Sequence, residues 1–244
     1  MVDLGFTPGD VLVVTGAGSG IGRATAVRGA QVGLAVATWD LNPDTVQATV
    51  DEITGAGGTA LAVIADVSDP AAVADGFART ATLGAARYLV NNAGPPSAVA
   101  LDFDAALVLA VGSMRRMAET WLATPPPAGA SLVNLASVAG NLIGTASDWY
   151  TAAKAAIAGY TRHLAAYRSD VVRANAVAPG MTDTPRIAGF ADSEMGQRVL
   201  ARVPLHRMAT PDEIAWAILF LLSPLASYVN GVLLPIDGGW TVTQ

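Results

Sequence analysis

Short apolar runs alternate along the chain with segments whose apolar residues recur at helical spacing. Apolar runs that predict buried strands cover residues 11–16, 34–40, 61–67, 88–94, 131–137, 172–180 and 232–239. Helical spacing predicts helices at 21–31, 43–54, 70–81, 103–122 and 150–167, and the run at 214–222 suits a buried helix. Near-continuous apolar strands separated by helices imply a parallel sheet covered on both faces. We therefore expect one doubly wound α/β domain over residues 1–244 with about seven strands.

Local signals refine this pattern at three places. Asn42 stands ahead of Pro43 and is a plausible N-cap for the helix that follows. The three prolines at 125–127 predict a turn inside the domain and not a domain boundary. Gly112 falls in the middle of the helix predicted at 103–122, where glycine costs about 1 kcal/mol relative to alanine. A glycine at this position therefore indicates a structural or functional reason for its presence.

Composition and charge exclude several classes of function. The net charge is −6 and no basic run exceeds two residues, so we expect no nucleic-acid partner. No apolar run approaches the ~18–20 residues that a membrane span needs. Cysteine is absent and the two histidines lie far apart, so we expect no metal site. The first residues lack the pattern of a signal peptide, which predicts a cytoplasmic protein.

The first predicted strand runs into the glycine-rich segment TGAGSGIGRA. Gly16, Gly18, Gly20 and Gly22 occupy alternate positions, and Ile21 stands at the last glycine site of the usual G-x-G-x-x-G pattern. Glycines at such a turn let the backbone approach a pyrophosphate, whose charge meets the N-terminus of the next helix. A flexible turn without a ligand is the alternative. The strand before and the helix after favour a dinucleotide.

Asp40 ends the second predicted strand, 24 residues after Gly16. A carboxylate at this point can accept hydrogen bonds from the adenosine ribose hydroxyls of NAD, and it would repel the additional phosphate of NADP. No arginine or lysine stands at 17–20 or 39–42 to offset that repulsion. The sequence therefore predicts NAD as the cofactor.

Three residues in the second half of the chain point to proton and hydride transfer. Tyr150 and Lys154 are four apart on a predicted helix and share a face, and Ser137 stands at the carboxyl end of a predicted strand. A free tyrosine has a pKa of about 10. We expect the nearby ammonium and a cationic nicotinamide to lower the pKa of Tyr150, so that it could accept an alcohol proton. Ser137 would hold the substrate oxygen in line while the nicotinamide takes the hydride.

The motifs TGAGSGIG, NNAG, Ser137 followed by YxxxK, NAVAPGMTDTP and IDGG resemble, in order and spacing, those of the short-chain dehydrogenase/reductase family. The resemblance covers about residues 9–240 and implies a Rossmann-type fold and hydride transfer between NAD and a secondary alcohol or ketone. It implies that Ser137, Tyr150 and Lys154 are catalytic, with Tyr150 as the acid/base and Lys154 also on the nicotinamide ribose. It further implies a substrate lid at about 185–203 and a homo-oligomer, either a tetramer or a dimer.

The same resemblance implies a set of residues that line the cofactor. Within it, Asp66 and Val67 would meet the adenine and Thr184 the carboxamide. The whole set is Gly16, Ser19, Gly20, Ile21, Gly22, Asp40, Leu41, Asp66, Val67, Asn92, Ala93, Gly94, Tyr150, Lys154, Pro179, Gly180, Met181, Thr182 and Thr184.

Gly112 departs from the family pattern. By the resemblance it occupies the position of an asparagine that helps to relay protons, and the segment before it is about half a dozen residues shorter than usual. Three functions stay open: an NAD-dependent alcohol dehydrogenase or ketone reductase, an NADP-dependent reductase of the 3-oxoacyl type, and a dinucleotide-binding regulator with impaired catalysis. Apolar wall candidates favour a hydrophobic or aromatic secondary alcohol. They are Pro95, Leu142, Trp149, Met181, Phe190 and Met195.

Overall fold

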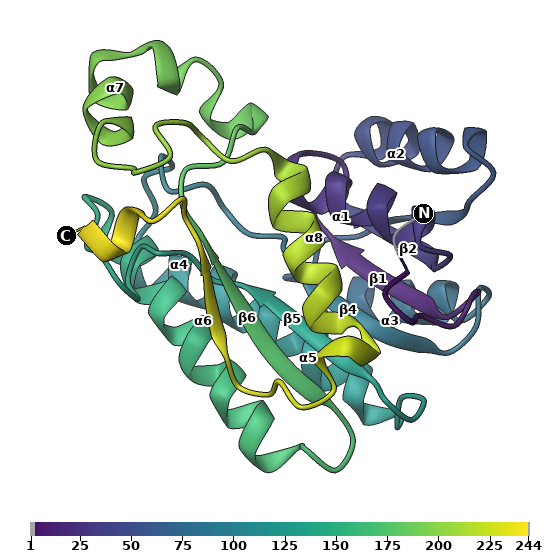
Figure 1. The fold of residues 1–244 in the computed structure, drawn as a ribbon. Coiled ribbons are helices and arrows are strands. Elements are labelled where there is room, and N and C mark those ends of the chain that lie inside the picture. The colour runs from purple at the N-terminus through teal and green to yellow at the C-terminus, as the bar shows by residue number, and fades with distance from the viewer. Residues whose placement is uncertain (1–2, 244) are drawn as a thin grey trace.

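A computed structural model of the chain describes residues 3–243. Within them, seven parallel strands form one sheet in the order β3-β2-β1-β4-β5-β6-β7 (Figure 1). The strands are β1 Val11–Thr15, β2 Ala35–Asp40, β3 Thr59–Ile64, β4 Ala86–Asn91, β5 Ser131–Leu135, β6 Arg173–Pro179 and β7 Leu233–Ile236. The predicted fold class, a seven-stranded parallel sheet of the Rossmann type, is confirmed.

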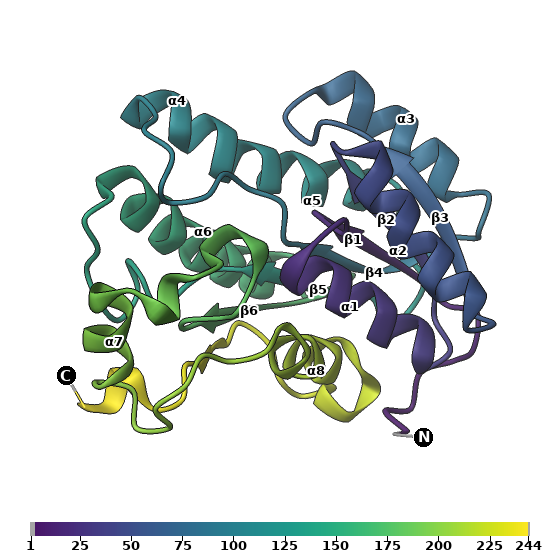
Figure 2. The ribbon, with the colours of Figure 1, turned by 90° about the horizontal axis from the view of Figure 1, so that it is seen from above.

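Helices cover both faces of the sheet (Figure 2). The helices on one face are α1 Gly20–Gln31, α2 Pro43–Gly55 and α8 Pro211–Leu222, and those on the other are α3 Pro70–Thr80, α5 Ser113–Ala123 and α6 Asp148–Tyr167. Alternate residues of β1 explain the two layers, because Leu12 and Val14 enter the core under α1 and α8 while Val13 enters the core under α5 and α6. Each strand is therefore apolar on both sides.

Local sequence signals set the ends of several helices. The side chain of Asn42 accepts hydrogen bonds from the backbone N–H groups of Asp44 and Thr45, at 3.0 and 3.1 Å, which confirms the predicted N-cap of α2. Thr210 and Glu213 form a capping box at the start of α8. The prolines at 125–127 fall in the connection between α5 and β5, as predicted.

The strand order reverses direction between β1 and β4, and this places a crevice at their carboxyl ends. The side chain of Asn92 lies across this junction. Its Nδ2 donates to the carbonyls of Thr15 at 2.9 Å and Gly16 at 3.1 Å, and its backbone N–H donates to the Thr15 hydroxyl at 2.9 Å. These bonds join the end of β4 to the glycine-rich turn after β1.

The helix predicted at 103–122 is interrupted. It forms as α4 Phe103–Leu107, a π-helical turn at Val108–Gly112 and α5, and the Ser113 hydroxyl donates to the Leu109 carbonyl inside the widened region. A Cβ atom on Gly112 would meet only Val108 Cγ1, at 3.8 Å, which is an ordinary contact. Gly112 therefore stands at the end of a π turn, and no close contact within the chain requires a residue without a side chain at this position.

The segment between β6 and α8 also carries short elements that the sequence pattern did not predict. They are 3₁₀ turns at Pro185–Ile187 and Phe190–Asp192 and the helix α7 Glu194–Leu200. Figure 1 shows α7 standing beyond the sheet, near the chain's last turn at Trp240–Thr243.

Replacing Gly112 with alanine should raise the free energy of unfolding by up to about 1 kcal/mol, because the backbone is helical and the new methyl group has room. Gly159→Ala is the matched control, since Gly159 lies within α6 with nothing near its Cβ position. Denaturant unfolding of both variants measures the effect. A loss of stability in Gly112→Ala alone would show that the π turn requires glycine.

Candidate active site

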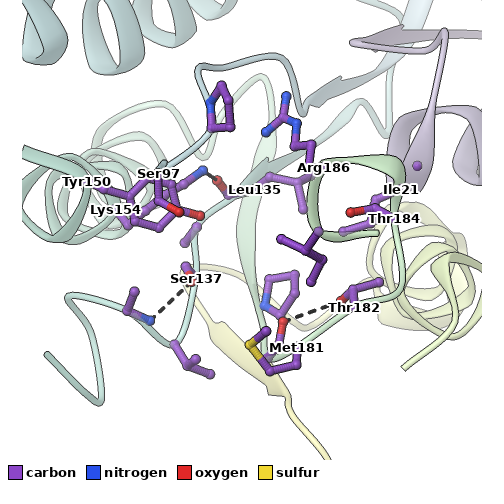
Figure 3. Close-up of a pocket in the computed structure, with 18 of the residues that line it drawn as sticks. Ile21, Ser97, Leu135, Ser137, Tyr150, Lys154, Met181, Thr182, Thr184 and Arg186 are labelled. Atoms are coloured by element: carbon purple, nitrogen blue, oxygen red, sulfur yellow. Dashed lines mark hydrogen bonds between the residues drawn. The ribbon is translucent and has the colours of Figure 1, made fainter. Parts of the chain in front are cut away.

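A cavity of about 280 Å³ lies at the carboxyl ends of β1, β4, β5 and β6. It receives residues from the glycine-rich turn, from the end of β5, from α6 and from the segment after β6 (Figure 3). Of the residues expected from sequence, those that line it are Gly16, Ser19, Gly20, Ile21, Asn92, Ser137, Tyr150, Lys154, Pro179, Gly180, Met181, Thr182 and Thr184.

The glycine-rich turn has a shape that only glycine permits. Gly16 and Gly20 have positive φ angles of 65° and 54°. A Cβ atom on Gly22 would stand 2.1 Å from the Gly16 carbonyl oxygen, and one on Gly18 would stand 2.3 Å from Thr45 Oγ1. The Ser19 side chain makes no cap to α1, and the first turn of this helix holds no acidic residue. The turn and helix N-terminus therefore fit a pyrophosphate group.

Asp40 sits beside this turn, at the end of β2. Its Oδ2 accepts from the backbone N–H of Gly18 at 2.8 Å, and its Oδ1 accepts from that of Asn42 at 3.1 Å. No salt bridge within residues 3–243 involves Asp40. Its negative charge therefore stands next to the phosphate-binding turn with no cation paired to it.

Ser137, Tyr150 and Lys154 come from two elements. Ser137 lies just after β5, and its Oγ accepts from the Ala139 backbone N–H at 3.1 Å. The other two lie on α6, where Lys154 Nζ is 5.5 Å from the centre of the Tyr150 ring and donates to the Leu135 carbonyl at 2.7 Å. That bond ties α6 to the carboxyl end of β5 and so sets the position of Tyr150 near Ser137.

Burial dominates the electrostatics of the two titratable residues. Burial raises the pKa of Tyr150, while the hydrogen bond with Ser137 and the charge of Arg186 act to lower it. Burial, with a smaller contribution from the charge of Arg186, lowers the pKa of Lys154 to about 8. The predicted lowering of the Tyr150 pKa by Lys154 and a bound nicotinamide stays a prediction: in the chain by itself, desolvation of the phenolate outweighs the Ser137 hydrogen bond and the charge of Arg186.

Among the polar residues at the site that the sequence analysis missed, Asn141 and Arg186 make contacts that join its parts, and Ser97 and Thr145 line the cavity. Asn141 Nδ2 donates to the Ser137 carbonyl and to the Lys154 carbonyl, both at 3.0 Å, and so links the catalytic loop to α6. Arg186 lines the cavity, and its Nη2 donates to the Gly94 carbonyl at 2.7 Å. Arg186 could have been noticed as a cation directly after the NAVAPGMTDTP motif, whereas Asn141 carries no local signal.

Gly112, which the resemblance places at the position of a relay asparagine, does not line the small cavity beside Tyr150 and Lys154. The residues of its helix that face Tyr150 and Lys154 are Ala110 and Met114, which line a small cavity of about 10 Å³. Gly112 is not among the lining residues: Ala110 and Met114, four residues apart, share one face of the helix, and Gly112 lies off that face. Ala110 and Met114, and not Gly112, therefore lie on the side of this helix that faces Tyr150 and Lys154. The Asn91 Oδ1 atom, buried without a protein partner, also belongs to a residue of this small cavity.

The remaining expected cofactor residues do not line the large cavity. Ala93 and Gly94 line the small cavity, Leu41 is exposed at 65 %, and Asp66 accepts from the Ser68 N–H at 2.7 Å in the turn after β3. Those outside the large cavity are Gly22, Asp40, Leu41, Asp66, Val67, Ala93 and Gly94.

The apolar wall differs from the one expected. Met181 lines the large cavity, and Pro95 and Trp149 line the small one. Leu142, Phe190 and Met195 line neither, and Leu142 and Met195 are exposed. Apolar lining residues that the sequence analysis missed include Pro96, Val138, Ile143, Ile187 and Trp240.

Comparison with known proteins identifies the family. The family model described as "Enoyl-(Acyl carrier protein) reductase" matches residues 16–241. The chain is 39 % identical to cis-4-hydroxycyclohexanecarboxylate dehydrogenase from Sinomonas cyclohexanicum, over 95 % of this chain and 96 % of that protein.

Solved structures agree with this result. A short-chain dehydrogenase from Burkholderia cenocepacia J2315 in complex with NADP matches with a TM-score of 0.87 at 32 % identity, over 96 % of this chain and 98 % of that one. A 7α-hydroxysteroid dehydrogenase complexed with NADH and 7-oxo glycochenodeoxycholic acid matches with a TM-score of 0.89 at 31 % identity, over 97 % and 96 %.

The chain belongs to the short-chain dehydrogenase/reductase family, as predicted. It is an oxidoreductase that acts on a hydroxyl or carbonyl group of a small molecule and uses a nicotinamide dinucleotide. Within residues 3–243, no helix is long and apolar enough to cross a membrane, and no cluster of side chains could hold a metal ion.

Lys154 is the only lysine in the sequence, so its titration can be observed without overlap. In protein labelled with ¹⁵N-lysine, the Nζ signal should titrate with a midpoint near 8 and not near its ordinary 10.5. Because the unfolded chain binds more protons between these values, this residue should increase the free energy of unfolding as pH rises from about 8 to 10.5. A midpoint above 10 in the folded protein would contradict the desolvation of this ammonium group.

Proposed function

We propose that this protein catalyses the NAD-dependent interconversion of a secondary alcohol on an apolar ring and the corresponding ketone. The observation that carries this proposal is the convergence of Ser137, Tyr150 and Lys154 on one cavity that also includes the phosphate-binding turn. A ring compound as substrate is supported by two of the relatives, cis-4-hydroxycyclohexanecarboxylate dehydrogenase and the 7α-hydroxysteroid dehydrogenase bound to 7-oxo glycochenodeoxycholic acid, and both compounds also carry an acid group.

The chain's own residues supply the proton chemistry. We propose that the Tyr150 oxygen accepts the alcohol proton in oxidation and returns it to the carbonyl oxygen in reduction. A bound nicotinamide would supply the hydride acceptor. The Ser137 hydroxyl, close enough to hydrogen-bond Tyr150, would hold the substrate oxygen. Lys154, fixed by the Leu135 carbonyl, would bind the nicotinamide ribose and stabilise the phenolate.

The small cavity offers a route for that proton. Ala110 has no side-chain amide, and the space of about 10 Å³ beside Lys154 is close to the volume that one water molecule needs. A water molecule there would satisfy the buried Asn91 Oδ1 atom. The missing amide is thus compatible with catalysis, and we favour the enzyme over a regulator that only binds dinucleotide.

Asp40 supports NAD over NADP, although a solved relative binds NADP. The carboxylate beside Gly18 would accept hydrogen bonds from the ribose hydroxyls, and no cation is paired with it to neutralise a 2′-phosphate. This argues against the NADP-dependent 3-oxoacyl reductase. We further propose that residues 185–203 form the substrate lid of a single domain, since Pro185, Arg186 and Ile187 border the cavity.

Cofactor titration followed by intrinsic fluorescence should show NAD binding tighter than NADP by about tenfold or more, equivalent to about 1.4 kcal/mol. Asp40→Asn, which removes the charge but keeps the shape, should narrow that ratio by improving the binding of NADP. Asp44→Asn is the control, because Asp44 is an exposed carboxylate in the first turn of α2. Tighter binding of NADP than NAD by the unmodified protein would refute the preference.

Tyr150→Phe should lower kcat by at least about 10²-fold and leave NAD binding nearly unchanged, because it removes the proton acceptor but little contact area. Because burial raises the pKa of Tyr150, kcat/KM for alcohol oxidation should increase with pH and that for ketone reduction should decrease. Absorbance at 340 nm measures both directions. Tyr160→Phe is the control. The Tyr160 hydroxyl donates to Glu119 at 2.6 Å, and Tyr160 does not line the cavity. Near-normal kcat in Tyr150→Phe would rule out this mechanism.

A further inference from the structure

Arg186 is a cation on the cavity wall with unused hydrogen-bonding capacity. It lies in the 3₁₀ turn Pro185–Ile187, is exposed, and donates from Nη2 to the Gly94 carbonyl at 2.7 Å. No salt bridge among residues 3–243 includes it. A guanidinium group carries five N–H donors in a planar fork that matches a carboxylate or sulfonate. The bond to Gly94 holds this side chain across the cavity while most of its donors stay available.

The position of Arg186 separates it from the phosphate-binding turn. Thr184, two residues earlier, faces that turn, because its Cγ2 lies 3.1 Å from the Cβ position of Gly20. Arg186 instead reaches Gly94, and its charge acts on both Tyr150 and Lys154. Figure 3 shows Arg186 across the cavity from Tyr150 and Lys154. The guanidinium therefore stands at the catalytic end of the cavity.

The charges that line the cavity are unbalanced. Among the described residues that line it, Lys154 and Arg186 are cations and none is Asp or Glu. The Lys154 ammonium already donates to the Leu135 carbonyl and belongs to the proposed catalytic trio. A cation at the catalytic end, with no acidic partner and with donors to spare, is complementary to an anion brought in by a ligand.

Resting on the proposed function, we propose that Arg186 is a specificity-determining residue that binds an anionic group on the substrate, such as a carboxylate or sulfonate attached to the ring away from the carbon that bears the hydroxyl. The substrate class is then a ring hydroxy acid and not a neutral alcohol. The dinucleotide phosphates share this anionic chemistry, so the test must separate the two sources.

The test compares two probes that differ only in charge: cis-4-hydroxycyclohexanecarboxylate and its carboxamide. The unmodified protein should oxidise the carboxylate with a kcat/KM about tenfold or more above that of the carboxamide. Arg186→Gln should lower this ratio about tenfold, mainly through the KM for the carboxylate, and Arg186→Lys should retain part of the preference. The dissociation constant for NAD should change by less than about twofold. Arg198→Gln is the control and should leave the ratio unchanged. Arg198 lies in the same segment, but it does not line the cavity and it is paired with Glu194 on its own helix.

Two results would overturn the inference while the proposed function stands. One is an unchanged ratio in Arg186→Gln. The other is a weakened affinity for NAD with equal losses on both probes, which would assign the guanidinium to the dinucleotide phosphates. If the unmodified protein oxidises neither probe, the proposed function fails for such ring alcohols. Binding of the two probes to the protein–NADH complex, followed by tryptophan fluorescence, then decides the role of Arg186: equal affinity for both would refute it.

Discussion

The hydrogen bond from Lys154 to the Leu135 carbonyl fixes the geometry on which the site depends. It places the chain's single ammonium side chain at the carboxyl end of β5 and anchors the first half of α6 against the sheet. Tyr150, one turn earlier on the same helix face, is thereby held near Ser137, and Asn141 reinforces the same junction from the loop. The cost is desolvation of a cation, which appears as the lowered pKa of Lys154.

A second constraint is the reversal of strand order between β1 and β4. It opens the crevice in which the glycine-rich turn, the end of β4 and the segment after β6 meet. Asn92 closes this junction with bonds to Thr15 and Gly16, so the phosphate-binding turn and the catalytic end share one rigid frame. The segment at 185–203 is built differently, from short turns and α7, and it supplies Arg186 from outside that frame. The proposed proton chemistry and the proposed recognition of the substrate by Arg186 therefore lie on separate parts of the fold.

Much of this architecture could be predicted from the sequence, because its main signals are local. Strand periodicity, the cap at Asn42 and the glycine-rich turn each depend on neighbouring residues. The π turn at Val108–Gly112 could not be predicted, because it leaves no distinct mark on apolar spacing. Ala110 and Met114 line the small cavity beside Tyr150 and Lys154, and Gly112 does not. Arg186 and Asn141 were missed for a related reason: each acts through carbonyl groups that only the tertiary fold brings near. The tyrosine pKa depends on burial, which pattern alone cannot give.

Direct hydride transfer between a carbinol carbon and a nicotinamide at this site is the central claim about the protein's chemistry. The most direct test uses a ring alcohol that carries deuterium at the carbon bearing the hydroxyl, incubated with the protein and NAD, with the reduced dinucleotide analysed by mass spectrometry. We expect one deuterium atom to be transferred per molecule of dinucleotide reduced, together with slower turnover than for the unlabelled alcohol. Reduced dinucleotide without deuterium, or no reduction with any labelled ring alcohol although NAD binds, would contradict the claim.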